Sequence, residues 1–309
     1  MKKEKKYSGV VIPAVTPFND KSELDIAAVE RMFDNFRKNN VSPFVLGTTG
    51  EASSVPTSMK QEFFTAAERL KQSGDVLYAG ISSNVFEESV ELAKQAFDNG
   101  VDVVVATLPS YYALTSDAML RYFNELADAV NGPLMIYNIP VTTHMSIPLE
   151  VIEKLSRHQN IVGLKDSERN EERLNEALLQ WKDRDDFSYF LGWAARSAHS
   201  LLKGGDGLVP STGNFHPGLY RDLFEAAKNG NEEKALSLQK LSDTLGNLYQ
   251  QGRTLGESLW ALKVVMKELN LCEPFVLPPL YPQPDEEEKR LQAAFHEIIT
   301  NKEIILNER

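Results

Sequence analysis

The sequence contains very little cysteine, with Cys272 as the single one among 309 residues. One cysteine excludes a disulfide within the chain and a metal site built from several thiolates. Long apolar runs are missing too, since no stretch approaches the roughly 20 residues that span a bilayer. The basic start Met1–Lys6 resembles a signal peptide, but the apolar run after it, Val10–Val15, is short and contains Pro13. We therefore expect a cytoplasmic protein with no membrane segment.

Positive charge is also scarce, because 33 Lys and Arg face 44 Asp and Glu, for a net charge of −11. Such a balance argues against binding along a nucleic acid backbone, although a small anion needs only a local positive site. No pair of histidines has a metal-binding spacing of i, i+4 or H-x-H. A metal-dependent aldolase is therefore disfavoured, and we expect neither a metal nor a cofactor.

What the sequence does contain is an alternation of short apolar segments with amphipathic helical ones. The expected strands are Val10–Val15, Phe44–Leu46, Val76–Ile81, Val101–Thr107, Leu134–Tyr137, Ile161–Lys165, Phe187–Leu191 and Gly207–Val209. The expected helices are Asp25–Lys38, Thr57–Gln72, Phe86–Asn99, Ser116–Val130, Pro148–Arg157, Arg169–Trp181, Ala194–Lys203 and Gly218–Asn229. Near-continuous Val, Ile and Leu indicates parallel strands that are buried on both faces. Eight such units, with no dinucleotide-binding glycine motif after the first, predict an α/β protein with a (β/α)8 TIM barrel over residues 1–229.

The remaining residues, 230–309, read as a C-terminal helical extension. The expected helices are Glu232–Gln251, Leu255–Leu269 and Glu286–Ile305, with a proline-rich connector from Pro274 to Pro284. This segment is too short to be assigned confidently as an independent domain, so we expect it to pack on the barrel or at a subunit contact.

Active sites of such barrels lie at the carboxyl ends of the strands, which selects a few segments. After the second strand, Gly47-Thr48-Thr49-Gly50-Glu51 offers hydroxyls and backbone N–H groups that suit a carboxylate or a phosphate. The same residues also suit an ordinary turn between a strand and a helix. The segment alone leaves both interpretations open.

Two further candidates end the fifth and sixth strands. Tyr137 begins Tyr137-Asn138-Ile139-Pro140, and its hydroxyl can both donate and accept a proton. Lys165 closes the apolar run Ile161–Leu164, where desolvation lowers the pKa of an amine and makes it a nucleophile. The alternatives are a tyrosine whose ring packs in the core and a lysine that begins a solvated loop.

Taken together, these segments resemble the signature set of the dihydrodipicolinate synthase / N-acetylneuraminate lyase family. The resemblance includes the step from Tyr137 to Lys165 and covers nearly the whole chain. The matching segments are Gly9–Phe18, Gly47–Glu51, Tyr137–Pro140, Gly163–Lys165, Gly204–Gly207 and Ser211–Asn214. It implies a class I aldolase on a (β/α)8 barrel with a C-terminal helical extension, which uses pyruvate or a 2-oxo acid and needs no metal.

The resemblance also implies catalytic roles. Lys165 would form a Schiff base with the ketone carbon, and Tyr137 would transfer protons. Tyr112 sits where the synthase branch borrows a tyrosine from a neighbouring subunit. The implied assembly is a homotetramer, built as a dimer of dimers.

Substrate-binding roles follow in the same way. Thr48 and Thr49 would hold the pyruvate carboxylate, and Gly192 and Val209 would line the pyruvate pocket through backbone groups. Ser167 sits where the lyase branches carry a hydroxyl near the substrate chain.

The sequence departs from both named activities. Thr142 stands where the synthase branch has an arginine for the second carboxylate. Gly192-Trp193-Ala194-Ala195-Arg196 lacks the acidic residues of the sialic acid lyases. We expect a distal pocket formed by Thr142, Thr143, Ser167, Trp193 and Arg196. Arg196 either reaches this pocket and holds a carboxylate or lies on the solvated face of its helix.

These departures favour a Schiff-base lyase that cleaves or forms a 2-keto-3-deoxy or 4-hydroxy-2-oxo acid from pyruvate and an aldehyde. The alternatives are a 4-hydroxy-tetrahydrodipicolinate synthase and an N-acetylneuraminate lyase. A third alternative is a barrel that has lost catalysis and binds a ligand, although retention of Lys165, Tyr137, Thr48 and Thr49 speaks against it.

Overall fold

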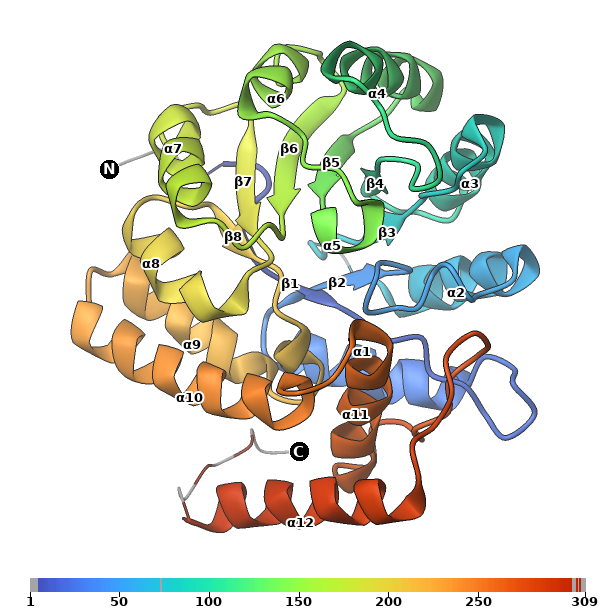
Figure 1. The fold of residues 1–309 in the computed structure, drawn as a ribbon, viewed down its shortest axis with the longest axis vertical. Coiled ribbons are helices and arrows are strands. Elements are labelled where there is room, and N and C mark those ends of the chain that lie inside the picture. The colour runs from blue at the N-terminus through green and yellow to red at the C-terminus, as the bar shows by residue number, and fades with distance from the viewer. Residues whose placement is uncertain (1–4, 73, 302–303, 305, 307–309) are drawn as a thin grey trace.

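A closed barrel of eight parallel strands forms the centre of the molecule (Figure 1). This computed structural model describes residues 5–72, 74–301, 304 and 306. The strands are β1 (Gly9–Pro13), β2 (Ser42–Val45), β3 (Tyr78–Gly80), β4 (Val103–Thr107), β5 (Leu134–Asn138), β6 (Ile161–Asp166), β7 (Ser188–Leu191) and β8 (Gly207–Leu208). Each strand pairs with the next one, and β8 returns to β1 through the pairs Gly9↔Gly207 and Val10↔Leu208. The predicted (β/α)8 barrel is therefore confirmed.

Helices follow the strands around the outside of the barrel. They are α1 (Ile26–Lys38), α2 (Thr57–Leu70), α3 (Phe86–Asp98), α4 (Ser116–Val130), α5 (Pro140–Thr143), α6 (Leu149–Leu155), α7 (Glu171–Trp181), α8 (Ser197–Leu202) and α9 (Pro217–Lys228). Two short 3₁₀ helices, η1 (Ala194–Arg196) and η2 (Ser211–Asn214), follow β7 and β8. The expected helix Ala194–Lys203 is thus divided into η1 and α8. α5 and η2 were not predicted, because four residues are too few to show helical periodicity.

The strands carry apolar residues on both faces because each face is covered. In β4, Val103 and Val105 point into the barrel, while Val104 and Ala106 belong to the layer between the strands and the helices. Side chains alternate along a strand, so a strand covered on both sides needs apolar residues at every position. The inner residues fill the barrel as a packed core.

Several helices begin at a residue whose side chain caps the first turn. The Asp25 carboxylate accepts a hydrogen bond from the backbone N–H of Ala28 at 3.0 Å and so starts α1. That helix then buries Val29, Met32 and Phe33 at helical spacing against the strands.

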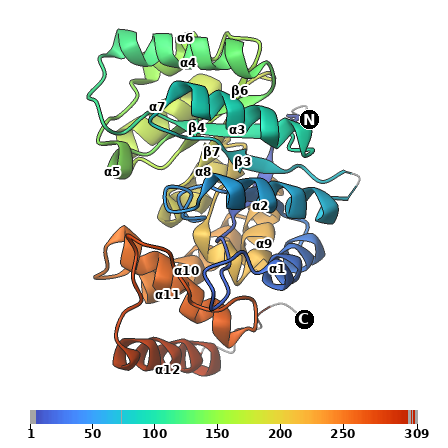
Figure 2. The ribbon, with the colours of Figure 1, turned by 90° about the vertical axis from the view of Figure 1, so that its right-hand side faces the viewer.

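Three helices form the C-terminal extension: α10 (Glu232–Gln250), α11 (Leu255–Glu268) and α12 (Asp285–Asn301). Figures 1 and 2 show α10 beside α9 and α11 between α12 and the barrel. The Gln239 side chain of α10 hydrogen-bonds Ala198 N–H and the Ala194 carbonyl, both at 2.9 Å, and so ties the extension to the segment after β7. The expected helix Glu286–Ile305 includes 302, 303 and 305, which lie outside the described residues. The boundary between 1–229 and 230–309 stays a prediction.

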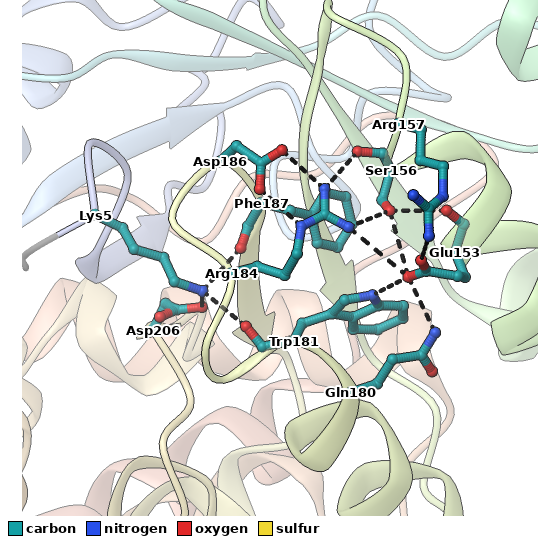
Figure 3. A network of polar contacts seen from close by, with 10 residues as sticks. All are labelled: Lys5, Glu153, Ser156, Arg157, Gln180, Trp181, Arg184, Asp186, Phe187 and Asp206. Atoms are coloured by element: carbon teal, nitrogen blue, oxygen red, sulfur yellow. Dashed lines mark hydrogen bonds and ion pairs between the residues drawn. The ribbon is translucent and has the colours of Figure 1, made fainter. Parts of the chain in front are cut away.

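A polar network closes the amino-terminal end of the barrel (Figure 3). Lys5 Nζ lies 2.7 Å from the Asp206 carboxylate and donates to the carbonyl oxygens of Phe187 and Trp181 at 2.8 and 3.1 Å. The Tyr189 N–H donates to the same Asp206 oxygen at 2.8 Å. Removing one partner of such a buried ion pair typically costs about 3–5 kcal/mol. Residues 1–4 of the basic start lie outside the described residues, whereas Lys5 contacts the barrel through this network.

Within the described residues, no helix combines the length and the apolar content needed to cross a lipid bilayer. In the same part of the chain, no three or more His, Cys, Asp or Glu side chains gather into a cluster able to hold a metal ion. The cytoplasmic location and the independence from a metal stay predictions.

Candidate active site

Lys165 is the centre of the candidate site. It lies near the carboxyl end of β6, where it pairs in register with Tyr137 of β5. Its side chain is buried, and Nζ lies 3.7 Å from the centroid of the Tyr137 ring and 4.8 Å from that of Phe44. The sixth strand therefore continues through Lys165, and the interpretation of a solvated loop is wrong.

Burial changes the protonation of Lys165. Desolvation lowers the pKa of the amine below its ordinary value, and the neighbouring Tyr137 hydroxyl opposes part of the shift. A lower pKa raises the fraction of neutral amine near pH 7, and the neutral amine is the nucleophilic form.

The Tyr137 hydroxyl connects the lysine to the loop after β2. Tyr137 Oη lies 3.4 Å from Thr48 Oγ1, at the long end of hydrogen-bond distance. Both Thr48 and Thr49 are half-buried. Tyr137 thus presents its ring to Lys165 and its hydroxyl to Thr48, so that the two candidate segments meet in one place.

The loop from Gly47 to Glu51 has a residue of unusual backbone conformation at each end. Leu46 and Glu51 have φ values of 55° and 53°, a left-handed conformation that non-glycine residues seldom adopt. Inside the loop, the Gly50 carbonyl accepts a hydrogen bond from Thr16 Oγ1 at 2.5 Å. The surrounding structure must fix this conformation, because the backbone alone does not favour it.

Gly192, Val209 and Ser167 lie at the same end of the barrel. The N–H of Gly192 donates to the Asp166 carbonyl at 2.7 Å, and that of Val209 donates to the Leu191 carbonyl at 2.8 Å. A Cβ atom on Gly192 would lie 2.0 Å from Ser167 Oγ, so this glycine leaves room for the serine hydroxyl. Both N–H groups are therefore used in hydrogen bonds between neighbouring strand ends, and a role of these residues in lining the site stays a prediction.

The two threonines expected in the distal pocket have hydroxyls that hydrogen-bond the backbone. Thr143 is buried, and its hydroxyl lies 3.1 and 3.0 Å from the carbonyl oxygens of Ile139 and Met145. The Thr142 hydroxyl likewise donates to Ile139 at 3.3 Å. These contacts stabilise α5, a role that the sequence alone did not indicate.

Arg196 forms an ion pair with a residue of another helix. Its guanidinium pairs with Glu171 at the start of α7 and lies 5.1 Å from the centre of the Trp193 ring. About two fifths of its side chain is exposed. Of the two orientations left open, the structure has the solvated one.

Tyr112 is exposed to solvent, unlike Lys165 and Tyr137. Its side chain is 72% exposed and packs edge-on against Tyr111, with 5.0 Å between the ring centres. Within one described chain it therefore forms part of the outer surface, whereas Tyr137 and Lys165 are enclosed.

Sequence reasoning missed a buried network beside Lys165. Asp166 accepts hydrogen bonds from Asn138 Nδ2 at 2.9 Å and Arg173 Nε at 2.7 Å. Burial raises the pKa of Asp166, and the Arg173 guanidinium and the Asn138 amide oppose the rise. The only sequence signal was Asn138 in the quoted motif, since Arg173 lies on the next helix with no visible relation to it.

Comparison with known proteins now decides the family. The model of the dihydrodipicolinate synthetase family matches residues 6–298. The chain belongs to this family.

A DapA-like lyase from Thermococcus kodakarensis is 29% identical to this family member over 94% of the chain and 99% of that protein. The dihydrodipicolinate synthase structure from Bacteroides thetaiotaomicron superimposes with a TM-score of 0.90 at 29% identity, and covers 96% of this chain and 100% of that one. A prophage protein of the same family from E. coli K12, solved in complex with pyruvate, has a TM-score of 0.87 at 24% identity, with 97% and 100% covered. The expected family and the expected lyase class are confirmed.

We predict that Gly80→Ala destabilises the protein, because its Cβ would lie 1.9 Å from the backbone oxygen of Leu46 at the start of the Thr48–Thr49 loop. Overpacking of this kind costs about 1–3 kcal/mol, and urea unfolding measures it. Gly246→Ala in α10 is the matched control, because outside the helix backbone its Cβ would lie no closer than 3.7 Å to Thr212 Oγ1 and 3.8 Å to Gln250 Nε2. Helix propensity favours alanine there by up to about 1 kcal/mol. Equal midpoints for the two variants would contradict the close approach of Gly80 to Leu46.

Proposed function

We propose that this lyase uses Lys165 to form a Schiff base with pyruvate or with a 2-oxo acid that releases pyruvate. The observation that carries the proposal is the burial of Lys165 against Tyr137 at the carboxyl end of the barrel. The proposed reaction needs no metal and no cofactor, because the protonated imine itself withdraws electrons from the adjacent carbon.

In the proposed reaction, the neutral Lys165 amine attacks the ketone carbon, and loss of water gives the imine. In the cleavage direction, the bond between C3 and C4 breaks, the electron pair enters the imine as an enamine, and an aldehyde leaves. Protonation and hydrolysis of the enamine then release pyruvate and the free amine. The low pKa of Lys165 supports the first step, since an ammonium ion cannot attack.

Tyr137 is proposed to carry the protons of these steps. Its ring contacts the lysine and its hydroxyl contacts Thr48, and a hydroxyl so close to the amine can give a proton to the departing water and later accept one. Thr48 and Thr49 are proposed to bind the carboxylate, with Gly192, Val209 and Ser167 beside the substrate. This arrangement fixes the carbonyl carbon in front of the amine.

Tyr112 is proposed to complete the proton path of a neighbouring subunit. Its exposure in the single chain supports this role, because an exposed pair of tyrosine rings is suited to a protein contact. The proposal includes a homotetramer, built as a dimer of dimers.

A short 2-oxo acid of the 4-hydroxy or 3-deoxy type is the proposed substrate. Residues 140–146 contain no lysine or arginine to bind a second carboxylate. Arg196 is paired with Glu171, and the Thr143 hydroxyl is held by backbone carbonyls, so neither is free for a long polyhydroxy chain. Condensation with aspartate semialdehyde remains the alternative, because the Bacteroides relative is named for that activity.

We expect incubation with pyruvate and borohydride to attach a reduced adduct to Lys165, because reduction traps the imine. Peptide mass spectrometry locates the adduct, and EDTA should not prevent its formation. Lys165→Met is the control, since it keeps an apolar side chain of similar length and has no amine. An adduct at another lysine, or none, would contradict the mechanism and favour a barrel without catalysis.

We expect Tyr137→Phe and Tyr112→Phe each to lower kcat by roughly 10²–10⁴-fold, because each removes a hydroxyl that transfers protons. Tyr111→Phe is the control, since it changes the neighbouring ring in the same way without a proposed role. Turnover is followed by the release of pyruvate. Wild-type turnover in Tyr137→Phe excludes that residue from the reaction, and in Tyr112→Phe it excludes the shared site.

We expect short 4-hydroxy-2-oxo acids to give the highest kcat/KM among four alternatives. The others are 2-keto-3-deoxygluconate, N-acetylneuraminate, and pyruvate with aspartate semialdehyde. The reason is that no lysine or arginine lies next to Thr142 in the sequence to bind a second carboxylate. In addition, no acidic residue follows Gly192 in 193–196 to accept hydrogen bonds from sugar hydroxyls. Efficient use of either of the last two would show that a different part of the site determines the substrate.

A further inference from the structure

Glu51 and Lys263 form an ion pair inside the protein that the proposed reaction does not use. Lys263 Nζ lies 2.5 Å from a Glu51 carboxylate oxygen, and both side chains are 0% exposed. Glu51 ends the carboxylate-binding loop after β2, whereas Lys263 belongs to α11 of the C-terminal extension. The pair therefore connects the proposed pyruvate site with a helix more than 200 residues later in the chain.

Lys263 is itself held in place by two further contacts. Its Nζ donates a hydrogen bond to the Phe275 carbonyl at 2.7 Å and lies 4.3 Å from the centroid of the Phe18 ring. Phe18 belongs to the segment after β1, and Phe275 belongs to the connector that follows α11. The ammonium is thus fixed between the barrel and the extension.

Stability alone is a poor explanation for this pair. Removing two charges from water is costly, and apolar residues of similar size often stabilise a core equally well. Burial raises the pKa of Glu51, while Lys263 and the backbone N–H of Leu277 favour the charged carboxylate. A buried ion pair that forms despite the cost of desolvation fixes the position of the groups around it.

The backbone of Glu51 connects the ion pair to the loop that contains Thr48 and Thr49. Its φ of 53° is left-handed, and a non-glycine residue keeps such a conformation only where its surroundings hold it. The Glu51 N–H donates to the Thr48 carbonyl at 3.1 Å, and its own carbonyl accepts from Ser54 at 2.8 Å. A shift of the Glu51 side chain therefore moves the residue that carries the proposed carboxylate ligand.

We infer that Glu51 and Lys263 are positioning residues, through which the C-terminal extension holds the Thr48–Thr49 loop in the geometry that binds the carboxylate of pyruvate. The inference rests on the proposed function for the identity of the ligand. It gives α11 a role in substrate binding, although Lys263 touches no substrate.

The test measures the pyruvate concentration that gives half-maximal borohydride trapping at Lys165. In Lys263→Met we expect this concentration to rise about tenfold, while the maximum trapped fraction stays close to that of the wild type, because the amine is intact. Lys5→Met is the matched control. It also breaks a buried ion pair, but at the opposite end of the barrel, so it lowers the melting temperature without changing the half-maximal concentration.

The double variant Glu51→Gln/Lys263→Met separates positioning from folding. It removes both charges, so it regains thermal stability relative to Lys263→Met, but it lacks the fixed ion pair and keeps the weakened pyruvate binding. Wild-type half-maximal concentrations in the folded single or double variant would overturn the inference. Failure of the proposed function is distinguishable, because wild-type protein would then form no adduct at Lys165.

Hydrogen exchange of the wild-type protein gives a readout that needs no variant. Coupling between two sites is reciprocal, so pyruvate that orders the loop also slows exchange in peptides covering 255–268. Peptides from α3 are the control, because that helix contains neither partner. Protection confined to the loop, with none in α11, would overturn the inference even if both variants failed to fold.

Discussion

Desolvation of one amine is the constraint on which the rest of the structure depends. A lysine at the end of a strand is ordinarily solvated, but Lys165 is enclosed by the rings of Tyr137 and Phe44. Parallel pairing in register makes this enclosure possible, because it places Tyr137 of β5 directly beside Lys165 of β6. The barrel therefore supplies a dry position for the amine and a rim of polar groups around it.

The two ends of the barrel contain different features. The amino-terminal end contains the Lys5–Asp206 pair and the network around Glu153, which join strands and helices far from Lys165 (Figure 3). The opposite end contains the left-handed residues Leu46 and Glu51, which cost stability. The buried helix α11 packs against this end, because its Lys263 pairs with Glu51.

The fold was readable from the sequence because its signal is repeated and local. Eight apolar segments separated by amphipathic ones leave few other topologies. The apolar run before Lys165 left a solvated loop as an alternative, and the resemblance to the family singled out this lysine. The distal pocket was harder to predict, because the orientation of Arg196 depends on Glu171, a residue on another helix. Nor could the sequence reveal the Glu51–Lys263 pair, since its partners are brought together only by tertiary packing.

The contact made by Lys5 has a consequence for the beginning of the chain. The Lys5 ammonium contacts three groups. They are the carbonyl oxygen of Trp181 at the end of α7, that of Phe187 just before β7, and the Asp206 carboxylate just before β8. These contacts join the segment before β1 to the end of α7 and to the segments before β7 and β8. Proteolytic trimming beyond Lys5 would leave Asp206 in a dry environment without that cation. Lys5 precedes these partners by 176, 182 and 201 residues, so its contacts form only after Trp181, Phe187 and Asp206 have been synthesised.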